Sequence, residues 1–216
     1  SPTTVPTNKH VTTFCATQMQ TNSLRDYRIT EKIYHGSHSV IHRAVNQLTD
    51  ERVLIKQLLV NHVSSNASPN YYENVFIKEY HMGRFLASKN PQFVTRYLDL
   101  VTNQFQSSHA IVIEDFGAVD LEQIIPEKGF ELQEFLEIAI QIVHGLSEIH
   151  RFNAIHRDIK PSNILLNQDM DTKICDFGLS RGIDFETENP MMSTPYVATR
   201  WYRAPGKSQQ HNNIGN

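Results

Sequence analysis

The segment His156-Arg157-Asp158-Ile159-Lys160-Pro161-Ser162-Asn163 combines three chemically different groups within eight positions. Asp158 and Asn163 supply oxygen atoms five positions apart, and Lys160 places a cation between them. Eighteen residues beyond Asp158 comes Asp176-Phe177-Gly178, which ends a short strand-like run. Phosphoryl transfer needs a carboxylate that accepts a hydroxyl proton, a cation that offsets phosphate charge, and hard oxygen ligands for Mg²⁺. The two motifs together therefore predict phosphoryl-transfer chemistry.

The same motifs, at the same spacing, resemble the catalytic loop and metal-binding motif of the protein kinase family. The resemblance runs from about Tyr27 to Pro205 and implies ATP and Mg²⁺ as cofactors. It implies that Asp158 is the catalytic base and that Asn163 and Asp176 hold the metal. It also makes Lys160 a catalytic residue of the serine/threonine class, since tyrosine kinases usually lack this lysine. A chance match of the His-Arg-Asp tripeptide is the alternative, and the long ordered match disfavours it.

Upstream, Val53-Leu54-Ile55-Lys56 resembles the strand motif whose lysine binds the ATP phosphates. Glu79 falls on the apolar face of a predicted helix, four residues after Val75 and three before Met82. A carboxylate on that face is costly unless a cation pairs with it, and the resemblance supplies Lys56. The alternative is a strand-end lysine that reaches solvent and an unrelated surface glutamate.

The segment Ala110–Asp120 resembles the hinge that binds adenine, with Ile113 as gatekeeper and the backbone of Glu114 and Phe116 bonding the base. Asp120 stands where the family often places a ribose contact, but it also fits the N-cap of a helix that starts at Leu121. The two interpretations of Asp120 carry equal weight. The ATP-binding residues implied by the resemblance are Ile33, Gly36, Ile41, Lys56, Glu79, Glu114, Phe116, Asp120 and Leu165.

The phosphate loop departs from the family pattern G-x-G-x-x-G-x-V. Its positions read Tyr34, Gly36, Ser39 and Ile41, so only the middle glycine is present. Glycine serves such a loop because its backbone approaches phosphates without a Cβ in the way. Tyr34 and Ser39 are expected to stiffen the loop or hold it off the phosphates. Leu54, where the family usually has alanine, is a second departure, and both bear on ATP affinity more than on the fold.

The segments Lys173–Leu179 and Thr194–Pro205 resemble the mitogen-activated protein kinases. Thr194 and Tyr196 match the dual phosphorylation pair of that family, and Arg157 and Arg200 are the candidates to receive the phosphate. This resemblance implies proline-directed phosphorylation of protein substrates and an upstream dual-specificity kinase as a partner. The alternative is that Thr194 and Tyr196 are ordinary loop residues.

Composition adds few further partners. The 216 residues carry a net charge of −3 and are 39% hydrophobic, so neither nucleic acid nor an anionic membrane surface is expected as a partner. No apolar run approaches the roughly 18–20 residues that span a bilayer, and the first residues do not resemble a signal peptide. A cytoplasmic or nuclear location is therefore expected.

The order of elements predicts an α+β fold with a β-rich N-lobe and an α-rich C-lobe. Residues 1–24 are expected to be a disordered leader, 25–205 a kinase domain and 206–216 a polar tail. Within the domain, 25–116 form the N-lobe and 117–205 a partial C-lobe. The strongest predicted helix is Leu132–His150, and residues 62–72 are predicted as a loop. The helix stripe expected to face the core is Leu132, Phe135, Leu136, Ala139, Ile142, Val143, Leu146 and Ile149.

Beyond Ala204-Pro205 the family's glutamate is replaced by Gly206, and the family's later helices have no counterpart. The chain is therefore expected to be a truncated kinase whose helix at Leu132–His150 lacks partner surface. Three interpretations follow: an active enzyme, a non-catalytic binding module of the pseudokinase type, and an inactive fragment. The first rests on the complete set of catalytic residues, and the other two rest on Tyr34, Ser39, Leu54 and the missing helices.

Overall fold

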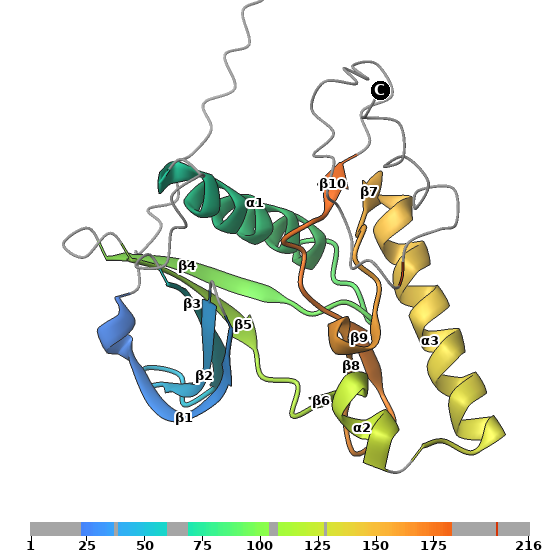
Figure 1. The fold of residues 1–216 in the computed structure, drawn as a ribbon. Coiled ribbons are helices and arrows are strands. Elements are labelled where there is room, and N and C mark those ends of the chain that lie inside the picture. Colours follow the sequence, from blue (N-terminus) through green and yellow to red (C-terminus); the bar gives the residue numbers. More distant parts are fainter. Residues whose placement is uncertain are drawn as a thin grey trace, which may run out of the picture.

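The computed structural model describes residues 23–36, 39–59, 69–103, 108–127, 129–182 and 202. These residues form two halves, one built on an antiparallel sheet and one dominated by a long helix (Figure 1). The predicted α+β class with a β-rich N-lobe is confirmed, and the part of the C-lobe that the structure describes contains few helices.

The N-terminal half is a five-stranded sheet with the order β1-β2-β3-β5-β4. Every pair in it is antiparallel, and alternate residues such as Val53 and Ile55 are buried, as expected for a sheet with one covered face. The strands are β1 (Tyr27–His35), β2 (Ser39–Asn46), β3 (Arg52–Leu58), β4 (Tyr97–Asn103) and β5 (Ser108–Glu114).

Two predicted boundaries are wrong by a few residues. The leader was expected to extend to residue 24, but Leu24–Asp26 form a 3₁₀ turn, η1, which Ser23 caps, and Leu24 packs on the cluster around Tyr27. The loop predicted over residues 62–72 ends earlier, because helix α1 (Pro69–Ala87) begins at Pro69. Proline suits this position, since the first turn of a helix does not use its N–H groups.

Helix α1 lies along the sheet beside β4, with Phe76, Glu79 and Leu86 buried against it (Figure 1). Gly83 permits this close approach, because a Cβ at that position would lie 2.3 Å from the Tyr97 ring. The helix that carries the predicted acidic partner of Lys56 is thereby held against the sheet that carries the lysine.

The C-terminal half has a small sheet of order β6-β8-β9 and a separate strand pair, β7 with β10. The long helix α3 packs against β9 and β7. The 3₁₀ turn η3 (Pro161–Asn163) leads directly into β8. The elements are β6 (Val119–Asp120), α2 (Leu121–Glu127), α3 (Leu132–Arg151), β7 (Ala154–Ile155), β8 (Ile164–Leu166), β9 (Thr172–Ile174) and β10 (Arg181–Gly182).

The predicted core stripe of α3 is only partly correct. The helix buries Ile138, Gly145 and Ile149, with Ile142 and Leu146 packed beside them. Four residues of the predicted stripe are exposed instead: Leu132 at 73%, Phe135 at 56%, Leu136 at 49% and Val143 at 65%. The helix is apolar on two faces, so its periodicity could not show which face the small sheet would cover. The second face is exposed in the structure.

One hydrophobic core crosses from one half to the other. Ile174 of β9 accepts hydrogen bonds at its carbonyl from the N–H and the hydroxyl of Thr95, both at 3.0 Å. Its own N–H donates to the carbonyl of Phe93 at 2.8 Å. The segment before β4 is therefore bonded directly to the strand that precedes Asp176.

None of the described helices is long and apolar enough to cross a membrane.

Candidate active site

Lys56 and Glu79 form the pair expected from the sequence. The Lys56 ammonium lies 2.7 and 2.8 Å from the two carboxylate oxygens of Glu79, which is only 3% exposed. Burial acts to lower the pKa of Lys56, but the charges of Glu79 and Asp176 outweigh it and hold the pKa above its ordinary value. Lys56 is therefore a permanent cation at neutral pH, placed on β3 and oriented by α1.

Tyr97, the first residue of β4, supports the Lys56–Glu79 pair. Its hydroxyl donates to Glu79 at 2.9 Å, and burial raises the pKa of Tyr97, so the hydroxyl keeps its proton. The ring of Phe177 packs edge-on against Tyr97 at 5.8 Å and against His156 at 5.1 Å between ring centroids. Phe177 thus joins the α1 side of the site to the catalytic loop through one buried ring.

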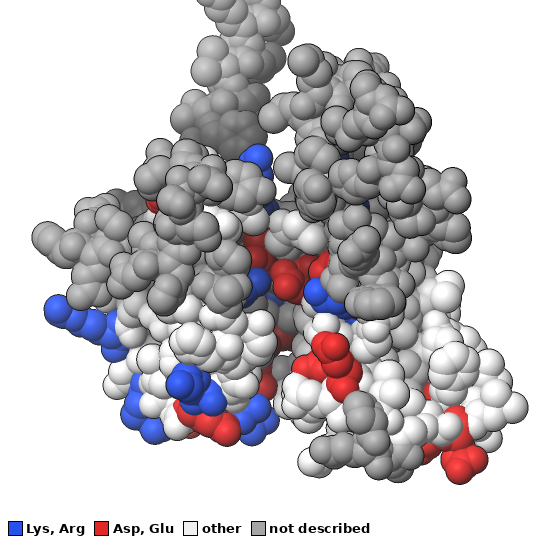
Figure 2. Space-filling model, viewed as in Figure 1, with Lys and Arg blue, Asp and Glu red and all other residues white. Residues whose placement is uncertain are grey.

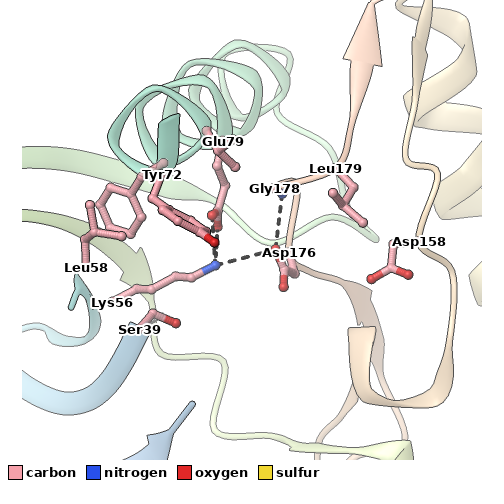
Figure 3. Close-up of a pocket in the computed structure, with 11 residues that line it drawn as sticks. Ser39, Lys56, Leu58, Tyr72, Glu79, Asp158, Asp176, Gly178 and Leu179 are labelled. Carbon is pink, nitrogen blue, oxygen red and sulfur yellow. Dashed lines mark hydrogen bonds and ion pairs between the residues drawn. The ribbon is translucent and has the colours of Figure 1, made fainter. Parts of the chain in front are cut away.

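Asp176 is the second carboxylate beside Lys56, and its Oδ1 lies 3.5 Å from the ammonium (Figure 3). Its backbone is left-handed, with φ of 62°, and its Oδ1 accepts the N–H of Gly178 at 3.1 Å. The charge of Lys56 keeps the pKa of Asp176 below its ordinary value despite burial. A left-handed aspartate costs about 1 kcal/mol, and here it turns an ionised carboxylate toward the lysine.

In the catalytic-loop segment, the predicted residues Lys160 and Asn163 both bond the third predicted residue, Asp158. Lys160 Nζ lies 2.9 Å from Asp158 Oδ2, and Asn163 Nδ2 donates to the backbone carbonyl and to Oδ2 of Asp158 at 2.7 and 3.1 Å. Asp158 and Asn163 are buried at 7% and 4% exposure. The N–H of Cys175 donates to the Asn163 carbonyl at 3.0 Å, which ties this loop to the segment of Asp176.

The described residues fit a magnesium ion that is held partly by protein oxygens and partly by the phosphates of a nucleotide. They contain no group of three His, Cys, Asp or Glu side chains placed to hold a metal by themselves. Asp176 offers an ionised carboxylate, and Asn163 uses its amide nitrogen on Asp158, which leaves the amide oxygen as its ligating atom. Mg²⁺ commonly takes one or two protein oxygens and completes its shell with phosphate and water.

Four of these residues, Lys56, Glu79, Asp158 and Asp176, line one cavity of about 330 Å³ between the two halves. Figure 3 shows Lys56, Glu79 and Asp176 on one side of the cavity and Asp158 across from them. Figure 2 shows acidic and basic atoms gathered in the same hollow. Ser39, Tyr72 and Gly178 also line the cavity, and the remaining wall is apolar: Leu58, Val75, Phe76 and Leu179.

His156 is a structural partner of the catalytic loop. Its Nε2 lies 2.9 Å from the carbonyl of Cys175, and its Nδ1 accepts the N–H of Asp158 at 3.3 Å. These bonds fit a neutral ring that is protonated on Nε2. Burial lowers the pKa of His156 from its ordinary value, because the site disfavours the charged ring.

This lowered pKa predicts an acid-sensitive fold. Below about pH 6.5 the unfolded chain binds a proton at His156 that the folded chain refuses, so the free energy of unfolding falls as pH decreases. Between pH 7.5 and 5.5 we expect a loss of about 1 kcal/mol, measured by urea unfolding. His156→Gln should be less stable at pH 7.5, but its free energy of unfolding should change less with pH over this range. Equal slopes in the two proteins would contradict the assignment.

The hinge residues lie where the sequence indicates, at the end of β5. Ile113 is buried and pairs with Leu54 across the β3–β5 ladder, so the second departure from the family pattern stands next to the predicted gatekeeper. The N–H of Glu114 donates to the carbonyl of Arg96 at 3.0 Å. A bond from the Glu114 backbone to a base would therefore use its carbonyl oxygen.

Asp120 is the N-cap of α2, because its Oδ1 accepts the N–H of Gln123 at 3.1 Å. Its Oδ2 accepts the side-chain amide of the same glutamine. The N-cap interpretation is therefore confirmed, and a ribose contact by Asp120 stays a prediction. Leu165 lies beside Asp120 on the neighbouring strand β8.

Tyr34 bends back over the remaining glycine of the phosphate loop. A Cβ on Gly36 would lie 2.6 Å from the Tyr34 hydroxyl and 2.8 Å from its ring, and the N–H of Gly36 donates to the carbonyl of Ser39 at 2.9 Å. Ile33 on β1 is 41% exposed and Ile41 on β2 is half-buried. The tyrosine thus lies against the loop backbone, consistent with the expected stiffening.

Arg157 is the one predicted phosphate-receiving residue within the described part of the chain. It has a φ of 69°, and its Nε donates to the carbonyl of Leu179 at 2.7 Å. Burial and then the charge of Arg181 lower the pKa of Arg157 from its ordinary value. Thr194, Tyr196 and Arg200 lie outside the described residues.

Sequence reasoning missed two members of this site, Tyr97 and Arg181. Tyr97 reaches Glu79 from a strand 18 residues away, and no local pattern indicates that contact. Arg181 carried a weak signal, since it follows Asp176 by five positions and precedes the Thr-Pro-Tyr segment.

The arrangement described above is that of one known class of protein. A family model described as a protein kinase domain matches residues 27–215. The chain therefore belongs to the protein kinase family.

Several of its curated relatives are named mitogen-activated protein kinases. Mitogen-activated protein kinase 16 of Arabidopsis thaliana is 36% identical over 183 residues, which are 83% of this chain and 31% of that protein. Mitogen-activated protein kinase 15 of Oryza sativa subsp. japonica is 35% identical over 83% of this chain and 35% of its own. Extracellular signal-regulated kinase 1 of Dictyostelium discoideum is 36% identical over 84% of this chain and 33% of its own. The chain spans about a third of the length of these relatives.

Proposed function

We propose that the chain carries the nucleotide and catalytic site of a kinase that transfers the γ-phosphate of Mg-ATP to serine or threonine hydroxyls. The observation that carries this proposal is Lys56, which bonds Glu79 and Asp176 at once in a cavity that Asp158 faces. A lysine and a carboxylate that share no function would not need to be buried together in this way. Lys56 would bind phosphate oxygens, and Asp176 and Asn163 would hold the Mg²⁺ that bridges them.

Each side chain has a role in the transfer itself. Asp158 Oδ2 would accept the proton of the attacking hydroxyl, and Lys160, 2.9 Å away, would offset negative charge on the phosphoryl group. Asn163 holds Asp158 by two hydrogen bonds, so the carboxylate is oriented before substrate binds. Magnesium, when bound, would neutralise charge on the phosphate oxygens.

The hinge would hold adenine through the Glu114 carbonyl and the Phe116 N–H, above Leu165 and below Ile33, Gly36 and Ile41. Asp120 would contact the ribose. We assign residues 25–116 to the N-lobe and 117–205 to a partial C-lobe, with the leader and tail outside them. The order of lobes in the described residues, with β5 leading into α2, supports this division.

The resemblance to mitogen-activated kinases supports proline-directed transfer to protein substrates and control by phosphorylation at Thr194 and Tyr196. An upstream dual-specificity kinase would be the partner, and the location would be cytoplasmic or nuclear. Arg157 and Arg181 support this control, because the charge of Arg181 disfavours the charge of Arg157 and a phosphate bound near them would offset both. Arg200 would join them as a third cation.

A non-catalytic binding module is the second candidate, and one observation favours it. Tyr34 lies on the backbone of Gly36, where phosphates would approach the loop. A module of this kind would keep the fold and bind partners without binding ATP tightly. The exposed apolar face of α3 offers it a surface.

A thermal melt with and without Mg-ATP separates these candidates. A folded binder in ligand at about 100 times its dissociation constant gains roughly 2.7 kcal/mol, so the melting temperature should rise. Asp176→Asn should remove the magnesium-dependent part of this rise, because the amide carries no charge for the ion. As a control, Asp169→Asn changes an exposed turn carboxylate and should leave the rise unchanged. A cooperative melt that Mg-ATP does not move would favour the binding module.

A further inference from the structure

The small sheet of the C-terminal half presents one row of residues toward the hinge. Asp120 of β6 pairs with Leu165 of β8, and Leu165 pairs with Lys173 of β9. Cross-strand partners point to the same face of a sheet, so these three side chains form a continuous row. Their neighbours Ile164 and Ile174 are buried on the opposite face. The row is therefore the platform on which the proposed adenine and ribose would rest.

Lys173 at the end of this row reaches the hinge directly. Its ammonium lies 2.6 Å from Glu114 Oε1 and 4.8 Å from the centroid of the Phe116 ring. Glu114 is bound from the other side by Arg96, whose N–H and Nε each donate at 2.9 Å. The Glu114 and Lys173 side chains are only 12% and 14% exposed. The two residues that would bond adenine by their backbones are thus both held by one lysine.

The hinge needs such an anchor, because residues 115–118 form neither helix nor strand. Gly117 has a φ of 66°, and its N–H bonds Asp115 Oδ1 at 3.0 Å, so the segment turns sharply between the halves. Burial acts to raise the pKa of Glu114, but hydrogen bonds from Lys173 and Arg96 bring it below its ordinary value. The Glu114 carboxylate is consequently ionised at neutral pH.

A largely buried ion pair of this kind adds little to stability, because desolvation offsets much of its attraction. Its effect on geometry is larger, since a short charged bond and a ring contact fix the distance between two elements. The elements fixed here are the hinge and the platform, whose separation sets the height of the slot for a purine ring.

We propose that Lys173 is a positioning residue for the adenine half of the nucleotide site. Through Glu114 and Phe116 it holds the hinge backbone at the correct height above Leu165, and it does not touch the phosphates. This inference rests on the proposed function, because it specifies how that site recognises its nucleotide. It follows that loss of Lys173 weakens binding of the purine and leaves the phosphate half, around Lys56 and Asp176, intact.

Calorimetric titration with adenosine, Mg-ADP and Mg-pyrophosphate tests this division. For Lys173→Met we expect the dissociation constants of adenosine and Mg-ADP to rise about tenfold, and that of Mg-pyrophosphate to change less than about twofold. Lys173→Arg keeps the charge and should recover most of the affinity. Lys89→Met, an equal change at an exposed lysine that contacts Phe85, is the matched control and should bind like the unchanged chain.

Two further results complete the test. If Lys173→Met fails to melt cooperatively, Glu114→Gln replaces it, because this change keeps the shape and removes the charge. An adenosine affinity that either folded variant retains would overturn the inference, and so would an equal loss for pyrophosphate. Absence of any adenine binding by the unchanged chain would overturn the proposed function as well, so the two failures are distinguishable.

Discussion

Replacement of Lys56 by methionine should reduce phosphoryl transfer by about a thousandfold and also destabilise the fold. The rate falls because the phosphates lose their preorganised cation, and groups of this kind are worth about 10²–10³ in rate. The fold suffers because Glu79, at 3% exposure, is left buried without its cation, which costs about 3–5 kcal/mol. Transfer of labelled phosphate to a protein substrate and urea unfolding measure the two effects separately.

The double variant Lys56→Met with Glu79→Gln separates catalysis from stability. Glutamine carries no charge, and its carbonyl can still accept the Tyr97 hydroxyl that now bonds Glu79 at 2.9 Å. We therefore expect it to recover most of the lost stability and none of the lost activity. Phosphorylation that persists in either variant would show that Lys56 does not serve the reaction. Full activity in the double variant alone would mean that the lysine is only structural.

The Lys56–Glu79 pair could be predicted because its signal is local. A glutamate at the apolar period of a helix requires a cation, and the resemblance of residues 53–56 to the family's strand motif identifies Lys56 as that cation. The catalytic-loop residues were likewise predictable, since the chemistry needs residues of these types and the order and spacing of Asp158, Lys160 and Asn163 match the family's motif. Their mutual bonds in the structure agree with that expectation.

Other features depend on contacts between distant segments and have no such signal. The role of Tyr97 follows from how β4 packs on α1, and the reach of Lys173 follows from how β9 meets the hinge. The left-handed backbone of Arg157 and Asp176 has no sequence signature, because neither residue type requires it. Helix α3 was predicted correctly, but its exposed face was misassigned. The hydrophobic periodicity of a helix does not show which of its faces other elements will cover.

Gly83→Ala should have the second large effect, because it should reduce the stability of the fold and disturb the geometry of the site. The new Cβ would lie 2.3 and 2.4 Å from Cγ and Cδ2 of Tyr97, in a ring that is 1% exposed and cannot move away cheaply. Alanine favours a helix over glycine by about 1 kcal/mol, but overpacking of a core costs about 1–3 kcal/mol and occasionally more. A contact this short belongs at the upper end, so we expect a net loss of about 2 kcal/mol.

The displaced ring also transmits the change to the catalytic residues. Tyr97 donates to Glu79 and packs on Phe177, so a shift of the ring disturbs the partner of Lys56 and the segment of Asp176 together. Gly83→Ala should therefore lower Mg-ATP affinity even at temperatures where the variant is fully folded. Gly182→Ala is the matched control, because a Cβ there meets its nearest atom only at 3.9 Å. Urea unfolding and Mg-ATP titration of both variants check the two effects, and a Gly83→Ala protein as stable as the control would show that α1 does not lie this close to β4.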